Sequence, residues 1–194
     1  MNILVIHGFN SAPGSKSKDL EKAFPNTNVI TPQLLNKPLQ DIEVLSEIVS
    51  SYKNLHIVGT SLGGFYAMYL MVKFKDREDI SFYIINPSYT PYDNFKTKIG
   101  SSFSNYKLGT VYTVCTEFVE ELGVLQKQVH SSPINLPNAY YYFGSKDIIL
   151  NYSKIKDRIR YYSTPYNILE SDQDHRHSDI SKVVNQIEIN SLEI

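Results

Sequence analysis

The stretch LHIVGTSLGGFYAMYL, residues 55–70, joins a strand pattern to a helix pattern through a glycine-rich turn. Residues 59–63 within it, GTSLG, match the motif G-x-S-x-G. In a strand–turn–helix of this kind the serine sits on a sharp, strained turn, and the flanking glycines avoid collisions with neighbouring backbone. The stretch therefore predicts that Ser61 is a nucleophile, exposed at the carboxyl edge of a parallel sheet beside a helix N-terminus. The alternative is an ordinary glycine-rich turn without a catalytic role.

Short apolar runs alternate with amphipathic patterns on both sides of this stretch, which is typical of a parallel sheet with right-handed crossovers. Several runs are apolar throughout, as strands buried on both faces should be. The predicted strands are Ile3–Ile6, Asn28–Thr31, Leu55–Gly59, Phe82–Asn86, Tyr140–Phe143 and Tyr166–Leu169. The predicted helices are Leu39–Tyr52, Gly63–Lys75, Thr116–Val129, Tyr152–Tyr162 and Ser178–Leu192. We expect one domain, residues 1–194, with the α/β-hydrolase fold: a doubly wound, mostly parallel sheet of about six strands.

The segment from Pro87 to Pro137 interrupts this alternation and contains a helix pattern but no clear strand. A long insertion of this kind usually carries function. We expect it to form a helical cap or lid over the carboxyl edge of the sheet.

The opening stretch VIHGFNSAPGSKSKDL, residues 5–20, runs from a strand into a loop of small residues. A phosphate-binding loop needs a lysine directly after its second glycine, but Ser15 follows Gly14 here. The dinucleotide-binding pattern fails as well, because no glycine stands two residues after Gly8. The loop fits an oxyanion hole better: in such folds the N–H groups of the residue after the nucleophile, Leu62, and of a residue in an earlier loop, Phe9, stabilise the oxyanion.

In a fold with this kind of nucleophile turn, the three catalytic residues follow one another along the chain in the order Ser, acid, His. This order selects the candidates for the acid and the base. His7 precedes Ser61, so we expect it to brace its loop and not to act as the base. His175 and His177 lie between the last strand and the last helix, where the base belongs, whereas His130 lies in the insertion. Asp147 follows the penultimate strand and is the favoured acid.

Two alternatives for these residues stay open. Asp93, after the preceding strand, is a second candidate for the acid. The spacing His175-x-His177-x-Asp179 resembles part of a metal site, but no histidine or cysteine follows it to complete a ligand shell. We expect no metal. A solvated loop without function is the remaining interpretation of this region.

Taken together, the chain resembles the YqiA-like esterases, a family of small bacterial α/β-hydrolases. The segments that carry the resemblance follow one another along nearly the whole chain: HGFNSAP at 7–13, TPQL at 31–34, GTSLGGFYA at 59–67, INPSYTPYDNF at 85–95, DIILNY at 147–152 and DHRH at 174–177. The resemblance implies Ser61 as nucleophile, Asp147 as acid and His175 as base. The chain departs from the family pattern at two places: Asp172-Gln173 replace a glycine pair, and His177 stands where an aromatic residue is usual. His177 therefore stays open as a second candidate for the base.

The resemblance implies hydrolysis of carboxylic esters, and also of acyl thioesters, without a cofactor. The insertion is rich in aromatic residues, and Tyr89, Tyr92 and Phe95 are candidate contacts for an apolar acyl group. The alternative is that these rings only pack the insertion onto the sheet. Two other functions are kept as alternatives: acyl transfer by the same triad, and binding without catalysis.

The composition also indicates which partners and which cellular location to expect. A formal net charge of −1 gives no global attraction to nucleic acid or anionic lipid. Cys115 is the single cysteine, so no intrachain disulfide is expected. The first residues read as a strand without a basic leader, and no apolar run approaches the length of a membrane span. We expect a cytoplasmic protein that acts on a small acyl ester, with neither nucleic acid nor membrane as partner.

Overall fold

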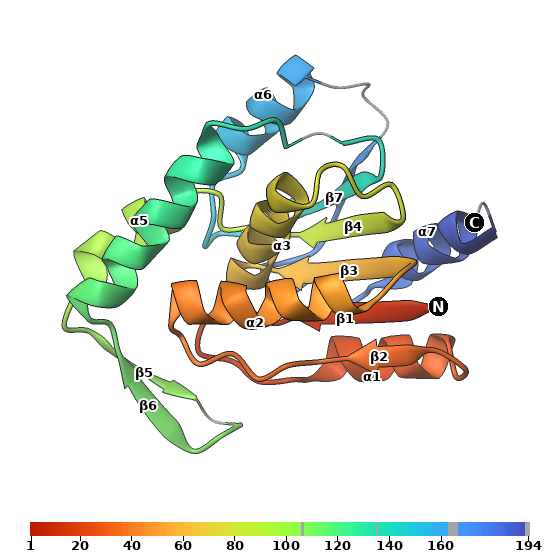
Figure 1. Cartoon of the computed structure of the whole chain (residues 1–194). Helices are drawn as coiled ribbons and strands as arrows, with labels where there is room; N and C mark the ends of the chain where they lie inside the picture. Colours follow the sequence, from red (N-terminus) through yellow and green to blue (C-terminus); the bar gives the residue numbers. More distant parts are fainter. Residues whose placement is uncertain (106, 135, 163–166, 193–194) are drawn as a thin grey trace.

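The fold is known from a computed structural model, which describes residues 1–105, 107–134, 136–162 and 167–192. Its centre is a sheet of six strands in the order β2-β1-β3-β4-β7-β8, in which every neighbouring pair is parallel (Figure 1). The strands are β1 (Asn2–Ile6), β2 (Asn28–Ile30), β3 (Leu55–Thr60), β4 (Ile80–Ile85), β7 (Ala139–Gly144) and β8 (Ile168–Ser171). The predicted fold class is confirmed.

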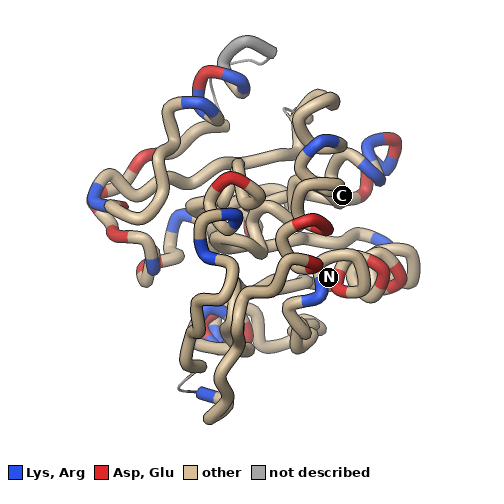
Figure 2. The backbone as a smooth tube through the Cα atoms, turned by 90° about the vertical axis from the view of Figure 1, so that its left-hand side faces the viewer, with Lys and Arg blue, Asp and Glu red and all other residues tan. Residues whose placement is uncertain are grey.

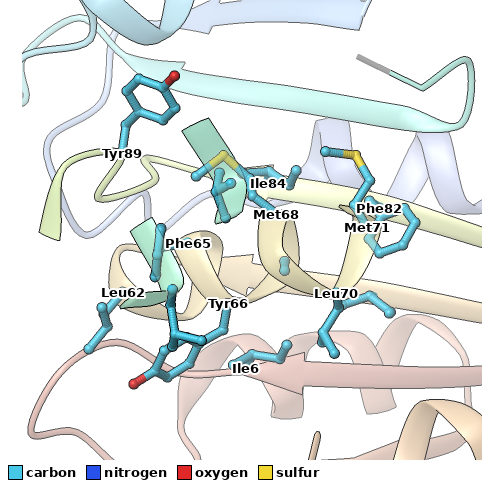
Figure 3. Close-up of a cluster of buried hydrophobic side chains, with 14 of the residues drawn as sticks. Ile6, Leu62, Phe65, Tyr66, Met68, Leu70, Met71, Phe82, Ile84 and Tyr89 are labelled. Carbon is cyan, nitrogen blue, oxygen red and sulfur yellow. The ribbon is translucent and has the colours of Figure 1, made fainter. Parts of the chain in front are cut away.

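Helices cover both faces of the sheet (Figure 1). Leu20 of α1 (Ser15–Ala23) and Val183 and Ile187 of α7 (Ser181–Leu192) share one buried cluster with the sheet. The other face is covered by α2 (Pro38–Ser51), α3 (Leu62–Lys73), α5 (Thr116–His130) and α6 (Ser153–Tyr162). Figure 3 shows the centre of this second cluster, where the apolar side chains of α3 pack among those of β1 and β4. The burial of both sheet faces removes a large apolar area from water and stabilises the doubly wound arrangement.

The strand predictions rested on continuous apolar runs, and the structure explains why they succeeded. All six residues of β4, Ile80–Ile85, are buried, because helices cover both faces of that central strand. The last strand occupies Ile168–Ser171 and not the predicted range Tyr166–Leu169, of which Tyr166 lies outside the described residues.

Several elements were not predicted, among them a helix after the opening loop and a hairpin in the insertion. Helix α1 follows the opening loop and contains Lys16 and Ser17, and its sequence SKSKDLEKA has few apolar residues to show a helical period. The insertion contains an antiparallel hairpin of β5 (Ser102–Asn105) and β6 (Thr110–Thr113), so the expectation of an insertion without strands is wrong. Each of these strands is only four residues long and mostly exposed, so neither produces an alternation of apolar and polar residues.

The insertion lies at the carboxyl edge of the sheet (Figure 1). It begins with α4 (Pro91–Phe95) and a short 3-10 helix, η1 (Lys96–Lys98), continues through the hairpin, and ends with α5. We call residues 87–137 the cap. Basic and acidic residues are interspersed along the tube in Figure 2 and do not gather into a single field of one sign. Among the described residues, none of the helices has the length and hydropathy to cross a lipid bilayer.

Candidate active site

Ser61 occupies a strained turn between β3 and α3. Its backbone has φ 57° and ψ −118°, a conformation that non-glycine residues seldom adopt and that requires support from its surroundings. That support comes from the backbone: the Ser61 N–H donates to Ile85 O at 3.0 Å, and Ser61 O accepts from Ser88 N–H at 3.0 Å and from Phe65 N–H at 3.1 Å. The turn is therefore held from β4 and from the start of the cap.

The two glycines of the motif allow the close packing of this turn. A Cβ on Gly59 would stand 2.9 Å from the Cβ of Ala67 and would overlap the carbonyl of Gly63. A Cβ on Gly63 would stand 2.5 Å from His7 O and would overlap the carbonyl of Ile6. Real Cβ atoms do not approach backbone oxygens so closely, so α3 packs directly on the chain that leaves β1 only because residue 63 is glycine.

The structure brings together the three residues that the resemblance assigns to a triad. Ser61 Oγ lies 3.1 Å from His175 Nε2, and His175 Nδ1 lies 2.6 Å from Asp147 Oδ2. In this arrangement the Nδ1–H donates to the carboxylate, and Nε2 accepts the hydrogen bond of the serine hydroxyl. The Asp147 side chain is fully buried, whereas the His175 side chain remains 21% exposed at the cleft.

Several donors surround the Asp147 carboxylate. Oδ1 accepts from Ile149 N–H at 2.8 Å and Leu150 N–H at 3.2 Å, and Oδ2 accepts from the Tyr152 hydroxyl as well as from His175. Burial alone raises the pKa of Asp147, but the hydrogen bonds outweigh burial and hold its pKa below the ordinary value. The carboxylate is thus charged at neutral pH and able to stabilise an imidazolium. The contribution of Tyr152 was not predicted, although it follows Asp147 by only five residues.

Asn86 connects the loops that carry the acid and the base. Its side chain is fully buried at the end of β4, and its amide Nδ2 donates to Asp174 O at 3.0 Å and to His175 O at 3.1 Å. Its Oδ1 accepts from Gly144 N–H at 2.8 Å. One amide therefore fixes the base loop against the ends of two strands. The sequence placed Asn86 at the end of a predicted strand and in the segment 85–95 that resembles the family, but it did not indicate this role; the φ of 42° at this position suits asparagine.

The sequence predicts that the backbone N–H groups of Leu62 and Phe9 stabilise the oxyanion. Leu62 is the first residue of α3, where the N–H groups have no partner within the helix. Phe9 follows Gly8, whose position is fixed beside the nucleophile: a Cβ on Gly8 would stand 3.3 Å from Ser61 Cβ and 3.7 Å from Ser61 Oγ. No acceptor for the Phe9 N–H occurs among the residues that the structure describes.

His7 has a bracing geometry. Its Nε2 accepts from Leu34 N–H at 3.1 Å, so Nδ1 carries the proton and donates to Gly8 O at 2.9 Å. Burial lowers the pKa of His7, and Lys107 lowers it further, which keeps the ring neutral. The ring thus orients the peptide that precedes Phe9.

A cleft of about 1050 Å³ opens beside Ser61 and His175, between the opening loop and the cap. Of the aromatic residues predicted to contact an acyl group, Phe95 lines this cleft together with Phe9 and Phe103. The Phe9 ring packs against Phe95 with ring centroids 4.7 Å apart and against Phe103 at 5.5 Å. Tyr89 instead belongs to the buried cluster of Figure 3, and its ring lies tilted against the His130 ring with centroids 4.4 Å apart. Tyr92 packs over Gly123 on α5. Neither tyrosine lines the cleft.

The alternative site residues lie elsewhere. His177 is 2% exposed and packs edge-on against Tyr142, away from Ser61. Asp93 pairs with Lys96 at 2.8 Å on the cap, and Asp179 accepts from Ser181 N–H at 2.9 Å at the start of α7. His130 Nε2 contacts Tyr89 O at 3.0 Å. Within the described ranges, no three His, Cys, Asp or Glu side chains converge as metal ligands.

Solved structures of other proteins share this fold. Alpha/beta hydrolase domain-containing protein 10 from mouse has a TM-score of 0.69 at 16% identity, over 98% of this chain and 88% of the mouse chain. Est1E from Butyrivibrio proteoclasticus, solved with ferulic acid bound, has a TM-score of 0.69 at 12% identity, over 99% and 88% of the two chains. A monoacylglycerol lipase from Paleococcus ferrophilus has a TM-score of 0.68 at 14% identity, over 96% and 93%. At these identities the likeness shows the α/β-hydrolase fold.

The family is shown by the sequence itself. The model of the family described as "Uncharacterised protein family (UPF0227)", which is the YqiA family, matches residues 2–190. The matched range includes Ser61, Asp147 and His175. The resemblance found in the sequence is therefore confirmed over nearly the whole length, and the chain belongs to the UPF0227 family.

Proposed function

We propose that this protein is a serine hydrolase that cleaves carboxylic esters of small molecules. The observation that carries the proposal is the continuous relay from Ser61 Oγ through His175 to the buried Asp147, with distances of 3.1 Å and 2.6 Å. A serine hydroxyl is a weak nucleophile unless an adjacent base accepts its proton, and the base needs a third group to fix its tautomer. The presence of a monoacylglycerol lipase among the structural neighbours supports ester chemistry on this fold.

The proposed reaction proceeds in two halves. His175 Nε2 accepts the proton of Ser61 as Oγ attacks the acyl carbonyl, and the N–H groups of Phe9 and Leu62 donate to the oxyanion. The same nitrogen then gives its proton to the leaving oxygen, the acyl–oxygen bond breaks, and the alcohol departs. Water, activated by His175, attacks the acyl-enzyme and releases the acid. Asp147 keeps the imidazole oriented and stabilises its charged form without accepting the proton.

The test uses a fluorophosphonate probe and short acyl esters on the full chain. We expect the probe to label Ser61, as located by peptide mass, and Ser61→Ala to remove both labelling and ester hydrolysis while the unfolding temperature stays the same. Labelling that persists in Ser61→Ala, or a wild-type protein that neither reacts with the probe nor hydrolyses any ester, would contradict the proposal. Hydrolysis that gives way to acyl transfer when an acceptor alcohol is added would favour the acyltransferase alternative.

A further inference from the structure

Several positively charged side chains line the cleft beside Ser61. Four basic side chains line it, from α1, η1, the β5–β6 turn and the base loop: Lys16, Lys98, Lys107 and Arg176. Among the described residues that line this space, Asp93 is the one carboxylate, and both of its oxygens are engaged, by Lys96 at 2.8 Å and by Gln126 at 3.2 Å. Within the described residues, none of the four basic side chains forms an ion pair.

Two of these cations are held close together although they come from distant parts of the chain. The Lys107 ammonium lies against Gly14, in the space that a Cβ on residue 14 would fill. Lys16 follows Gly14 by two residues along the chain, and its Nζ donates a hydrogen bond to the carbonyl oxygen of Arg176 at 2.6 Å. Burial lowers the pKa of Lys16; the carboxylates of Asp19 and Asp174 raise it, and Lys107 lowers it. The two carboxylates thus offset the effect of Lys107 on Lys16, but among the described residues neither of them forms an ion pair with Lys16.

The position of this pair relative to the triad decides which part of a substrate it meets. Lys16 is bonded to Arg176, the residue directly after His175. His175 Nε2 must come within hydrogen-bond reach of the leaving oxygen to return its proton. The remainder of the leaving alcohol then extends along the side of the cleft on which residues 175–178 and α1 lie. The other side is lined by Phe9, Phe95 and Phe103, which suit an apolar acyl group.

We infer that Lys16 and Lys107 form a subsite for an anionic group, phosphate or carboxylate, on the alcohol part of the ester. This inference rests on the proposed function and specifies its substrate class. Among the described residues neither ammonium group forms an ion pair, so an anion held between them can accept charge-assisted hydrogen bonds from both. The covalent steps are unchanged: the acyl group passes from the alcohol oxygen to Ser61 Oγ, and the anionic alcohol leaves with the proton from His175.

Four esters separate the position and the nature of the charge. Hydroxyethyl butyrate is neutral, phosphoethyl butyrate and carboxymethyl butyrate carry an anion on the alcohol, and monoethyl succinate carries one on the acyl group. We expect the wild-type kcat/KM to favour one or both esters with an anionic alcohol over hydroxyethyl butyrate by about tenfold or more, and not to favour monoethyl succinate. The two anionic alcohols show whether phosphate or carboxylate is preferred.

The variants are Lys16→Gln, Lys107→Gln and their combination, with Lys18→Gln as the matched control, because Lys18 is an exposed residue of the same helix outside the cleft. We expect the double variant to lose the preference for the anionic alcohol, so that the ratio of its kcat/KM values on the anionic and neutral esters falls to about one. Lys18→Gln should leave both rates unchanged. Equal wild-type rates on all four esters, or a preference that survives in the double variant, would overturn the subsite.

A binding measurement keeps this test separate from the test of esterase activity. Inorganic phosphate titrated into the wild-type protein, followed by calorimetry, should bind, and binding should weaken about tenfold or more in the double variant and not in Lys18→Gln. If Ser61 proves unreactive but phosphate binds in this lysine-dependent manner, the proposed reaction fails and the anion subsite stands. If esters are cleaved but phosphate does not bind and charge makes no difference, the subsite fails alone.

Discussion

The carboxyl edge of the sheet and the cap are held by different kinds of contact. At the edge, the elbow at Ser61 and the loops of Asp147 and His175 are fixed largely by main-chain hydrogen bonds and by carbonyls that pack against glycine. The cap meets the cleft through aromatic side chains, with the Phe9 ring surrounded by Phe95, Phe103, Tyr112 and Phe118 at centroid distances of 4.7–5.6 Å. The contacts at the edge fix the positions of Ser61, Asp147 and His175, whereas the ring contacts shape the wall of the cleft. We therefore expect changes at the edge to alter the chemical step and changes in the cap to alter substrate choice.

The largest effect is expected at the edge, from His175→Ala. Loss of the base should lower kcat by on the order of 10³-fold or more, about as much as Ser61→Ala, because members of a triad act as a unit. The double variant should be scarcely slower than either single variant. His177→Phe is the control, measured by ester hydrolysis in the same assay, and should keep most of the activity. A dead His177→Phe beside an active His175→Ala would move the base two residues along the chain.

A smaller loss at the edge is expected from Asn86→Asp, which keeps the acceptor for Gly144 N–H and removes the donors to Asp174 O and His175 O. A slight misplacement of the base should lower kcat by about 10- to 100-fold. The same change should add almost nothing in the His175→Ala background, because orientation no longer matters without the base.

The comparison of Asn86→Asp in the two backgrounds distinguishes positioning from general destabilisation. If Asn86 served stability alone, the loss of activity would be the same with and without His175, and it would follow the fraction unfolded. Thermal unfolding of each variant provides that fraction.

In the cap, Phe103→Ala should change selectivity and leave the chemistry intact. Phe103 lines the cleft and packs edge-on against Phe9. Its truncation should lower kcat/KM for longer acyl esters by about three- to tenfold, mainly through KM, with little change for acetyl esters. The control is Val111→Ser, an exposed position on the same hairpin outside the cleft. An equal loss on every chain length would place Phe103 with the oxyanion loop in function and erase the distinction between the regions.

The smallest effect on activity is expected from His177→Asn, whose consequence is for acid stability. Burial lowers the pKa of His177 to about 4, below its ordinary 6.5. Between pH 4 and 6.5 the side chain is therefore protonated in the unfolded chain and neutral in the folded one. The free energy of unfolding falls as the pH drops from about 6.5 toward 4, and this group contributes at most about 3 kcal/mol to the fall. Asparagine does not titrate and tolerates the φ of 47°.

Urea unfolding at several pH values measures this difference. His56, whose pKa burial also lowers to about 4, contributes the same slope to both proteins, so the difference between them isolates His177. The variant should lose less stability on acidification than the wild type. Parallel pH profiles of the two proteins would show that His177 is protonated in the folded state as readily as in the unfolded one.

How far the sequence predicts this molecule follows the same division. The strands and the elbow were found from local patterns, because a strand buried on both faces is apolar throughout and a nucleophile turn needs glycines at fixed spacing. The hairpin at 102–113 was missed because its strands are four residues long and most of their residues are exposed, which leaves no apolar run to find. Asn86 and Tyr152 were missed because single polar residues acquire their roles only when distant loops meet. Tyr89 and Tyr92 illustrate the converse, since aromatic content alone does not tell a ring in the core, as in Tyr89, or a ring on the outside of the cap, as in Tyr92, from a ring at the cleft.

The hydrogen bond from Gly144 N–H to Asn86 Oδ1 has a consequence for observation in solution. The Gly144 amide is buried, and it can exchange with solvent only when the junction of β4, β7 and the base loop opens. Its deuterium exchange rate therefore measures how often the contact between Gly144 and Asn86 opens, with neither substrate nor turnover required. Glycine amides resonate in a sparsely populated region of a nitrogen–proton spectrum, so the exchange of this single proton can be followed separately as a measure of how often the contact opens.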